Sequence, residues 1–434
     1  MTPSPCGTAE KDIGLEFYHS DSRGTGGRLK VFSEDFIVDE ISDLPPPKDE
    51  GRYSIARVTV RNWEMNRLVK QLARSLRISR NRIGFAGTKD KRAITSQLMS
   101  FEIGPQELQQ LEMDDIWIDD VYQASRPVRI GDLIGNRFSV KVRECVLEGQ
   151  DLKDDVEHCR VQLDELGGFP NYFGVQRFGV SRPITHLVGR SIVKGDMRGA
   201  VVTYLSHPSK HEDEHAASYR KELEQPDGRD DLLDDFPRNM NFERTLVEHL
   251  ARRPEDYAGA IRQLPDNLQM MFVHAYQSYM FNRILSERMR RGIPLQEPIV
   301  GDMVLPMGEK RVPIHERPIE VTQGNIDLVT DQVRAGKAFI SAVLFGSESR
   351  YAEGEMGEIE RAVVETECLR PDDFKVPDAQ RCSSKGSRRE VLCPYESLKT
   401  EHVDDGYILS FSLTKGNYAT CLLREFMKSQ MENY

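Results

Sequence analysis

A single carboxylate lies among cations in a short turn that opens with glycine. Asp90 is preceded by Lys89 and followed by Lys91 and Arg92, three residues after Gly87. Nearby cations stabilise an ionised carboxylate, which is the form that nucleophilic or general-base chemistry requires. The same cations could dock a phosphodiester backbone. Lysine and aspartate are also common in surface hairpin turns, so the segment alone leaves a catalytic and a structural interpretation open.

A second segment has the composition of a base-recognition site. Residues 171–179 read NYFGVQRFG and interleave aromatic rings, amides and an arginine with two glycines. Such side chains can stack on an unpaired base and hydrogen-bond to its edges. A core strand that ends in glycine turns has a similar composition, so both interpretations stand.

Other candidate sites are weaker. Residues 274–282 (HAYQSYMFN) place aromatic rings at helical spacing, which indicates packing more often than a ligand site. The glycines at 24–27 and 84–87 lack the context of nucleotide-binding loops. The seven cysteines are scattered without a Cys-x-x-Cys pair, and Cys382, Cys393 and His402 match no standard zinc spacing. We therefore expect free thiols and no metal.

Charge is distributed unevenly along the chain, whose formal net charge is -11. Residues 57–92 contain eleven basic residues and two acidic ones, a local excess of nine positive charges. Residues 212–235 contain ten acids against three basic residues, an excess of seven negative charges. A polyanion such as RNA would be held by the first segment and repelled by the second. The distribution permits RNA binding.

The elements that must position Asp90 follow from periodicity. Strands are predicted at 27–42, 53–60, 83–86, 94–103, 136–146 and 407–413, and helices at 267–291 and 419–428. Asn62 is predicted to cap a helix that runs to about Ser79. The buried face of this helix comprises Met65, Leu68, Leu72 and Leu76, and a neighbouring basic stripe comprises Arg67, Lys70, Arg74 and Arg77. The stripe is either a solvated outer face or a contact surface for RNA backbone.

The length of 434 residues exceeds one usual hydrophobic core. The sequence changes character after about Met197, with an acidic segment, a long helix and a Pro- and Gly-rich stretch. A core domain interrupted by an insertion is favoured over two domains in series. No apolar run approaches the roughly 18–20 residues that span a bilayer, and residues 1–11 do not resemble a secretion signal. We therefore expect a cytoplasmic protein.

Four segments together resemble the TruD family of tRNA pseudouridine synthases, in an archaeal-type or similar long form. They are residues 34–40 (EDFIVDE) with Lys30 upstream, 87–97 (GTKDKRAITSQ), 171–179, and 415–420 (KGNYAT) followed by 423–426 (LREF). The resemblance implies an α+β fold, with a pseudouridine-synthase catalytic domain of mixed, mainly antiparallel sheet flanked by helices. It also implies a TruD-specific α/β insertion domain at 197–391, which leaves residues 1–196 and 392–434 as the catalytic domain.

The resemblance further implies a reaction and its residues. The family isomerises uridine 13 of tRNA, and its catalytic aspartate corresponds to Asp90, with Lys30 as the charge partner. Asn171 corresponds to the active-site asparagine and Phe173 to the aromatic that stacks on the target uracil. Candidate RNA-binding residues are Arg67, Lys70, Arg74, Arg77, Lys89, Lys91, Arg92 and Arg177. No cofactor or metal is implied, and the route through Asp90, covalent attack or proton abstraction towards a glycal, stays open.

Two other classes of function are weighed against this one. An RNA-binding or tRNA-folding chaperone would not need the intact motif around Asp90. An aspartyl-nucleophile phosphotransferase would place a second acid two residues beyond the nucleophile to help bind Mg²⁺, but that position holds Arg92. The isomerase is therefore the favoured function, with tRNA as the partner.

Overall fold

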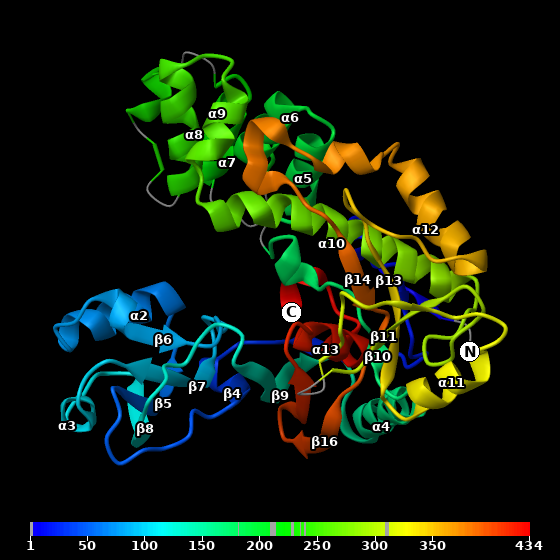
Figure 1. Cartoon of the computed structure of the whole chain (residues 1–434), viewed down its shortest axis with the longest axis horizontal. Coiled ribbons are helices and arrows are strands. Elements are labelled where there is room, and N and C mark those ends of the chain that lie inside the picture. The colour runs from blue at the N-terminus through cyan, green and yellow to red at the C-terminus, as the bar shows by residue number, and fades with distance from the viewer. Residues whose placement is uncertain are drawn as a thin grey trace.

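The computed structural model describes residues 3–180, 182–208, 214–226, 230–234, 236–237, 240–308 and 312–434. The acidic segment 212–235 lies partly outside these described ranges. Figure 1 shows a large sheet with α2 and α3 in its lower part and a mainly helical region, α5 to α10, above it. In the described part of the chain, no helix is both long enough and apolar enough to cross a membrane.

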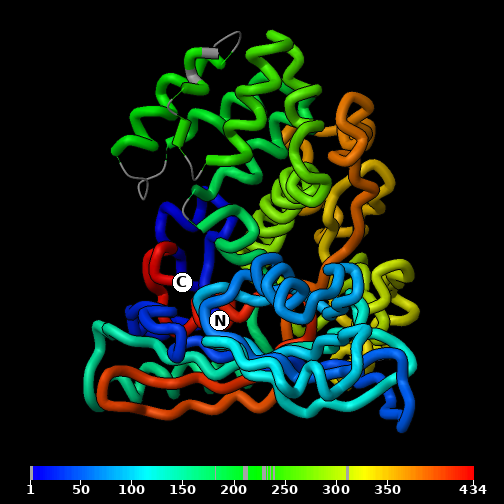
Figure 2. Tube along the Cα trace, turned by 90° about the vertical axis from the view of Figure 1, so that its left-hand side faces the viewer, coloured from blue at the N-terminus to red at the C-terminus, as the bar shows by residue number. Residues whose placement is uncertain are grey.

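The main sheet has nine strands in the described ranges and joins both ends of the chain. Along its path the order is β16 (Glu396–Val403), β17 (Gly406–Thr414), β9 (Leu133–Cys145), β4 (Phe36–Ser42), β7 (Ile94–Phe101), β5 (Tyr53–Arg61) and β8 (Ile116–Ala124). Short strands β3 (Gly26–Arg28) and β6 (Ile83–Phe85) pair with β9 and β7. Only β4 and β7 run parallel. Figure 2 shows the C-terminal strands lying beside the earlier strands of this sheet.

The predicted strands at 53–60, 94–103, 136–146 and 407–413 correspond to β5, β7, β9 and β17. The fold class predicted from the sequence, mixed α+β with mainly antiparallel pairing, is confirmed. Alternation places Phe36 and Val38 of β4 and Phe138 of β9 on one buried face of the sheet. That face packs against α4 (Gly149–Leu166) and α13 (Ala419–Met427).

Helix α2 (Met65–Ser75) covers the other end of the sheet. Its predicted buried face is confirmed for Met65, Leu68 and Leu72, which are nearly inaccessible, whereas Leu76 is half-buried at the C-cap. The predicted start is wrong: Asn62 has a left-handed φ of 60° and lies outside the helix. Glu64 is the cap instead, because its carboxylate accepts the backbone N–H groups at positions 66 and 67, each at 3.0 Å. The helix also ends at Ser75, four residues before the predicted end.

A second sheet has the order β12 (Ile319–Glu320), β11 (Met303–Pro306), β13 (Ala338–Leu344) and β14 (Ser387–Glu390) in the described residues. It is antiparallel throughout and packs against α10 (Asp266–Arg290), the long helix predicted at 267–291. Helix α5 (Thr185–Val193) lies along α10. Gly189 permits this close approach, because a Cβ there would meet the Phe272 carbonyl oxygen at 2.0 Å.

The remaining elements are short or peripheral. They are β1 (Ser4–Pro5), α1 (Thr8–Lys11), β2 (Phe17–Tyr18), α3 (Pro105–Gln109), β10 (Phe169–Pro170), α6 (Met197–Ser206), α7 (Glu214–Glu222), α8 (Asn241–Arg252), α9 (Tyr257–Gln263), α11 (Ile326–Arg334), α12 (Gly354–Thr366) and β15 (Leu392–Cys393). The part of the chain from α5 to β14 is called the second region below. Strand β10 precedes it and pairs with β15, which follows it, so the segments on either side of the second region lie next to each other. The insertion limits at 197 and 391 stay a prediction.

A buried ion pair ties α10 to the loop before β11. Arg288 and Asp302 are both 0% exposed and form two bonds, Nη1–Oδ1 at 2.6 Å and Nη2–Oδ2 at 2.9 Å. The guanidinium also donates to the carbonyl oxygen of Pro294. Four of its donor contacts go to protein oxygens, and Nη1 also lies 3.3 Å from the Met356 sulfur, so the guanidinium has protein partners in the interior.

We predict that Arg288→Met lowers the free energy of unfolding by about 3–5 kcal/mol, because Asp302 is left as an unpaired buried charge. Equilibrium urea denaturation measures the loss. The exposed pair between Arg334 and Glu297, 3.0 Å apart, provides the matched control. Arg334→Met should cost less than about 1 kcal/mol. Equal losses in the two variants would contradict the assignment.

Candidate active site

Asp90 and Lys30 meet at the surface of the main sheet. The Lys30 Nζ lies 2.6 Å from Asp90 Oδ1, and the two side chains are 15% and 41% exposed. The ammonium also lies 4.2 Å from the centre of the Phe36 ring. Lys30 adopts a left-handed φ of 55°, a conformation that costs a non-glycine residue about 1 kcal/mol or more and is held by its contacts. The structure thus joins two residues that are 60 positions apart in the sequence.

Lys89 points in the opposite direction from its neighbour Asp90. Its ammonium lies 2.7 Å from Glu40 Oε2 and donates to Asn136 Oδ1 at 3.0 Å. The two charged side chains are 6% and 0% exposed. The other oxygen of Glu40 accepts the backbone N–H of Leu98. Lys89 therefore holds the loop that carries Asp90 against β4 and β9. The predicted contact of Lys89 with RNA is corrected, because its ammonium group is buried and paired with Glu40.

Asn171 is 1% exposed and is held by the second sheet. Its Nδ2 donates to the Glu390 carbonyl oxygen at 3.0 Å, and its Oδ1 accepts Arg389 Nη2 at 2.6 Å. The backbone N–H of Asn171 donates to the Val391 carbonyl oxygen. Segment 171–179 is therefore an irregular loop with one 3-10 turn, Val175–Arg177, and the alternative of a core strand is wrong. The Asn171 N–H bonds to the residue that follows β14, and the Phe173 N–H donates to Asn282 Oδ1 of α10 at 2.8 Å.

The Phe173 ring lies in an aromatic and cationic environment and is 6% exposed. Phe281 and Tyr418 meet it edge to face at 5.5 and 5.9 Å. The Arg389 guanidinium lies 4.2 Å from its centre, and that of Arg177 lies 5.6 Å away. Phe281 belongs to the aromatic run at 274–282, and its full burial confirms that the run serves mainly in packing.

Two titratable neighbours of these arginines are neutral at neutral pH. Burial raises the pKa of the Tyr418 phenol above its ordinary value, against the opposing charges of Arg177 and Arg389. Burial lowers the pKa of His274, and the charge of Arg177 lowers it further. The positive charge beside Phe173 is therefore carried by the two guanidinium groups.

The turn between β17 and α13 links the Asp90 loop to the Phe173 loop. The Gly416 carbonyl oxygen accepts two bonds from Arg389, each at 3.2 Å. The Lys415 backbone N–H donates to the Ile134 carbonyl oxygen at 2.9 Å, and the Lys415 Nζ reaches the Gly131 carbonyl oxygen at 3.4 Å. The Gly131 N–H in turn bonds to Ala86, the residue before the Asp90 turn. All four motif segments thus belong to one connected region.

Arg389 is the residue of this region that the sequence analysis did not single out. The only sequence signal was a pair of consecutive arginines, Arg388 and Arg389, just before the predicted end of the insertion. Such pairs are usually solvated, so nothing in the sequence distinguished one of them from the other. The distinction depends on which side of β14 each side chain occupies.

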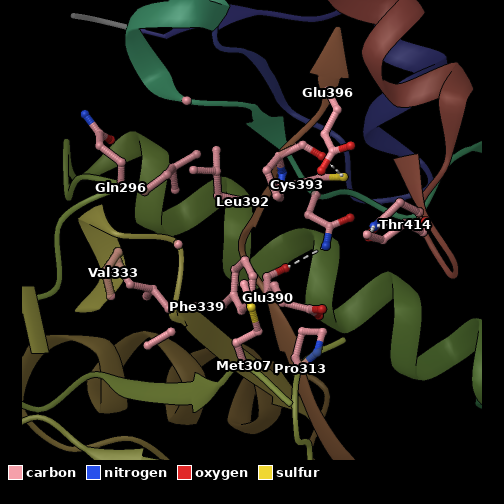
Figure 3. A pocket seen from close by; sticks show the side chains of 18 of the residues that line it. Gln296, Met307, Pro313, Val333, Phe339, Glu390, Leu392, Cys393, Glu396 and Thr414 are labelled. Atoms are coloured by element: carbon pink, nitrogen blue, oxygen red, sulfur yellow. Dashed lines mark hydrogen bonds between the residues drawn. The ribbon is translucent and has the colours of Figure 1, made fainter. Parts of the chain in front are cut away.

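A large cavity of about 840 Å³ lies beside this region, between the ends of the main strands and the second sheet. Figure 3 shows Met307, Val333 and Phe339 on one side of it and Thr414 and Glu396 on the other. Asn171 contributes to its lining, but neither Asp90 nor Lys30 does. The pair of Lys30 and Asp90 is therefore separate from the lining of this cavity.

The predicted basic stripe is present on the surface. Arg67, Lys70 and Arg74 of α2, with Arg77, Lys91 and Arg92, are all exposed. Within the described ranges, no carboxylate comes within 4.0 Å of these six cations. Arg177 differs, because it bonds to Ser278 of α10 at 3.1 Å and lies beside Phe173. The surface of α2 thus offers several unpaired cations to a polyanion.

The cysteines and the grouping of potential metal ligands can be described directly from the arrangement of side chains. All seven cysteines are free. Burial raises the pKa of the Cys382 and Cys421 thiols to about 12, which keeps them protonated and unreactive. Among the residues that the structure describes, no three His, Cys, Asp or Glu side chains are grouped as metal ligands.

Comparisons with known proteins give a consistent result. A family model described as tRNA pseudouridine synthase D (TruD) matches residues 12–426. A probable tRNA pseudouridine synthase D from Methanococcoides burtonii is 40% identical over 426 residues, covering 96% of this chain and 97% of that protein. A protein of the same description from Natronomonas pharaonis is 38% identical over 437 residues, covering 98% of each. The crystal structure of a TruD protein from Methanosarcina mazei is 36% identical with a TM-score of 0.87, covering 99% of this chain and 100% of that one.

The mixed, mainly antiparallel fold and the full-length matches define a pseudouridine synthase. Within that class, the chain belongs to the tRNA pseudouridine synthase D (TruD) family. The family resemblance that four sequence segments indicated is confirmed over almost the whole chain. The roles of individual residues stay predictions.

We predict that Lys89→Met lowers the free energy of unfolding by about 3–5 kcal/mol, since it leaves the buried Glu40 carboxylate unpaired. Adding Glu40→Gln should restore part of the loss, because the second change removes the unpaired charge. Lys91→Met, on the exposed side of Asp90, is the matched control and should change stability by less than about 0.5 kcal/mol. Urea denaturation measures all variants, and a neutral Lys89→Met would rule out the proposed anchoring of the loop.

Proposed function

We propose that this chain isomerises one uridine of tRNA, uridine 13, to pseudouridine, with Asp90 as the catalytic carboxylate. The observation that carries the proposal is the 2.6 Å ion pair between Lys30 and Asp90 on an accessible loop, in a chain of the TruD family. The relatives named above are described as tRNA pseudouridine synthases, which supports tRNA as the substrate. The cytoplasm, where tRNA is present, is the location we propose.

The reaction requires a carboxylate and a way to turn the base. The bond between N1 of uracil and C1′ of ribose breaks, the uracil rotates, and C5 forms a new bond to C1′ while the C5 proton is lost and N1 is protonated. Nothing is oxidised or hydrolysed overall, so the proposal needs no redox cofactor, metal or ATP. The ionised form of Asp90 can begin the reaction either by attack at C1′ or by removing a ribose proton.

Each neighbouring residue has a role that its surroundings suggest. Lys30 stabilises the charge of Asp90 and fixes its direction through the 2.6 Å contact. Asn171 holds the loop around the base, because both of its side-chain polar atoms bond to protein. Phe173 forms an aromatic wall for the extruded uracil. Since its ring is 6% exposed and Arg389 lies over one face, we propose contact along its accessible edge rather than full stacking.

Binding of tRNA is assigned to the exposed cations around α2. Arg67, Lys70, Arg74, Arg77, Lys91 and Arg92 would contact phosphates and orient the RNA without reading its sequence. A uridine in folded tRNA must leave its stack to reach Asp90, which costs a few kcal/mol. The phosphate contacts offset that cost and place the extruded nucleotide beside the Asp90 loop.

The experiment that tests this function maps pseudouridines in unmodified tRNA after incubation with the protein. Primer extension on carbodiimide-treated RNA should stop at position 13 alone. Asp90→Asn should reduce product at least about 1000-fold, because it removes the charged oxygen on which either route depends. Its tRNA affinity should be unchanged.

Asp114→Asn is the matched control, since Asp114 is an exposed aspartate of the same sheet region with no assigned role. It should retain full activity. Wild-type amounts of pseudouridine formed by Asp90→Asn would contradict the catalytic role of Asp90. Stops at positions other than 13 would change only the proposed target uridine. A protein that refolds tRNA without making pseudouridine would instead be the RNA chaperone.

We predict that Arg74→Ala weakens tRNA binding while leaving the rate at saturating tRNA unchanged. Loss of one phosphate contact should reduce the slope of log affinity against log salt concentration by about one. Filter binding at several salt concentrations measures this slope. Lys153→Ala, which removes an exposed cation on α4, is the control and should leave the slope as it is. An unchanged slope in Arg74→Ala would exclude α2 from the interface.

A further inference from the structure

Strand β14 presents its two arginines to opposite sides. Arg388 enters the core of the second region, where it pairs with Glu360 at 2.6 Å and bonds to Ser341. Arg389 points the other way, because successive side chains of a strand alternate between its faces. It leaves the second sheet and reaches the loop at Asn171 and the turn at Gly416.

The Arg389 guanidinium joins two of the motif segments, 171–179 and 415–420, through separate groups. Nη2 donates to Asn171 Oδ1 at 2.6 Å, and Nε points to the Asn171 carbonyl oxygen at 3.4 Å. Nη1 and Nη2 both donate to the Gly416 carbonyl oxygen. Its Cζ atom lies 4.2 Å from the centre of the Phe173 ring and 6.0 Å from that of Phe281. The planar fork of arginine makes all these contacts at once, which the single ammonium of lysine cannot do.

The charge of Arg389 is not used in an ion pair. In the described part of the chain, no carboxylate lies within 4.0 Å of its guanidinium, and its partners are neutral oxygens and rings. Arg389 is half-buried, and removing a cation from water costs free energy that neutral partners offset only in part. If Arg389 served only to stabilise the fold, we would expect a carboxylate as its partner. Arg388, one residue earlier, has such a partner in Glu360.

We propose that Arg389 is a positioning residue of the active site, through which the second sheet sets the geometry of the base pocket. The residue clamps Asn171, the Phe173 ring and the turn at Gly416 into one arrangement. That turn continues through Lys415 and Gly131 to the start of the Asp90 loop. The second region thus contributes directly to the site rather than serving only to contact RNA. The inference rests on the proposed isomerase function.

Loss of the clamp is expected to affect the chemical step more than binding. A displacement of about 1 Å in a reacting group can cost roughly 100-fold in rate. Because Arg389 is directed at protein groups, tRNA affinity should not depend on it. The expected signature is a fall in the single-turnover rate at saturating tRNA with an unchanged dissociation constant.

The test uses the full chain with unmodified tRNA, and compares Arg389→Ala, Arg389→Lys and the wild type. Both variants should form pseudouridine about 100-fold more slowly at saturation and bind tRNA as the wild type does. Millimolar guanidinium ion should partly restore the rate of Arg389→Ala, while sodium chloride at the same ionic strength should not. Arg350→Ala removes a guanidinium that is 72% exposed on the same region and is the matched control, expected to be fully active.

Three results would overturn the inference. A wild-type rate in Arg389→Ala shows that the clamp is unnecessary. A raised dissociation constant with a normal rate at saturation shows that Arg389 is a phosphate ligand instead. A slow variant with a lowered unfolding temperature and no response to guanidinium shows a merely structural role. Absence of pseudouridine with the wild type is a different outcome, because it refutes the proposed function itself.

Discussion

The buried ion pair between Lys89 and Glu40 is the contact on which the geometry of the candidate site depends. The 2.7 Å ion-pair contact holds the residue directly before Asp90 against the central strand β4. Asp90 then points outward, where Lys30 meets it at 2.6 Å. An exposed loop would otherwise sample many directions, and a reacting carboxylate must keep one. The buried pair of Lys89 and Glu40 thus keeps the loop rigid. The exposed pair of Lys30 and Asp90 cannot do this alone, because exposed ion pairs contribute little to stability.

A second constraint comes from the topology of the main sheet. Strand β17 from the C-terminal end pairs along its whole length with β9, and β9 pairs with β4. The turn at Gly416 is linked through Lys415 and Gly131 to Ala86, at the start of the Asp90 loop. The second sheet then approaches from the other side and contributes Arg389. The candidate site therefore lies where the two sheets meet, and one hydrophobic cluster contains buried residues of both sheets.

Much of the site was predictable from local sequence. The segment around Asp90, the loop at 171–179 and the C-terminal turn were identified as motifs, and family membership is confirmed. The prediction of residue roles failed where burial or backbone conformation gives a residue a different role from the one that its type suggests. Lys89 and Lys91 flank Asp90 symmetrically in the sequence, yet one is buried and paired while the other is exposed. Asn62 had the side chain of a helix cap, but a left-handed backbone places Glu64 in that role.

The sequence by itself determined the fold class, the family, the buried face of α2 and most strands, because periodicity and motif order depend only on neighbouring residues. Tertiary structure alone decided which cations are unpaired and that Arg389 reaches the candidate site. It also decided that both polar side-chain atoms of Asn171 form hydrogen bonds within the protein. These depend on contacts between residues tens to hundreds of positions apart, such as Lys30 with Asp90 and Asn171 with Arg389. The physical reason is that the role of a charged or polar group depends on its solvation and partners, which only the packed chain defines.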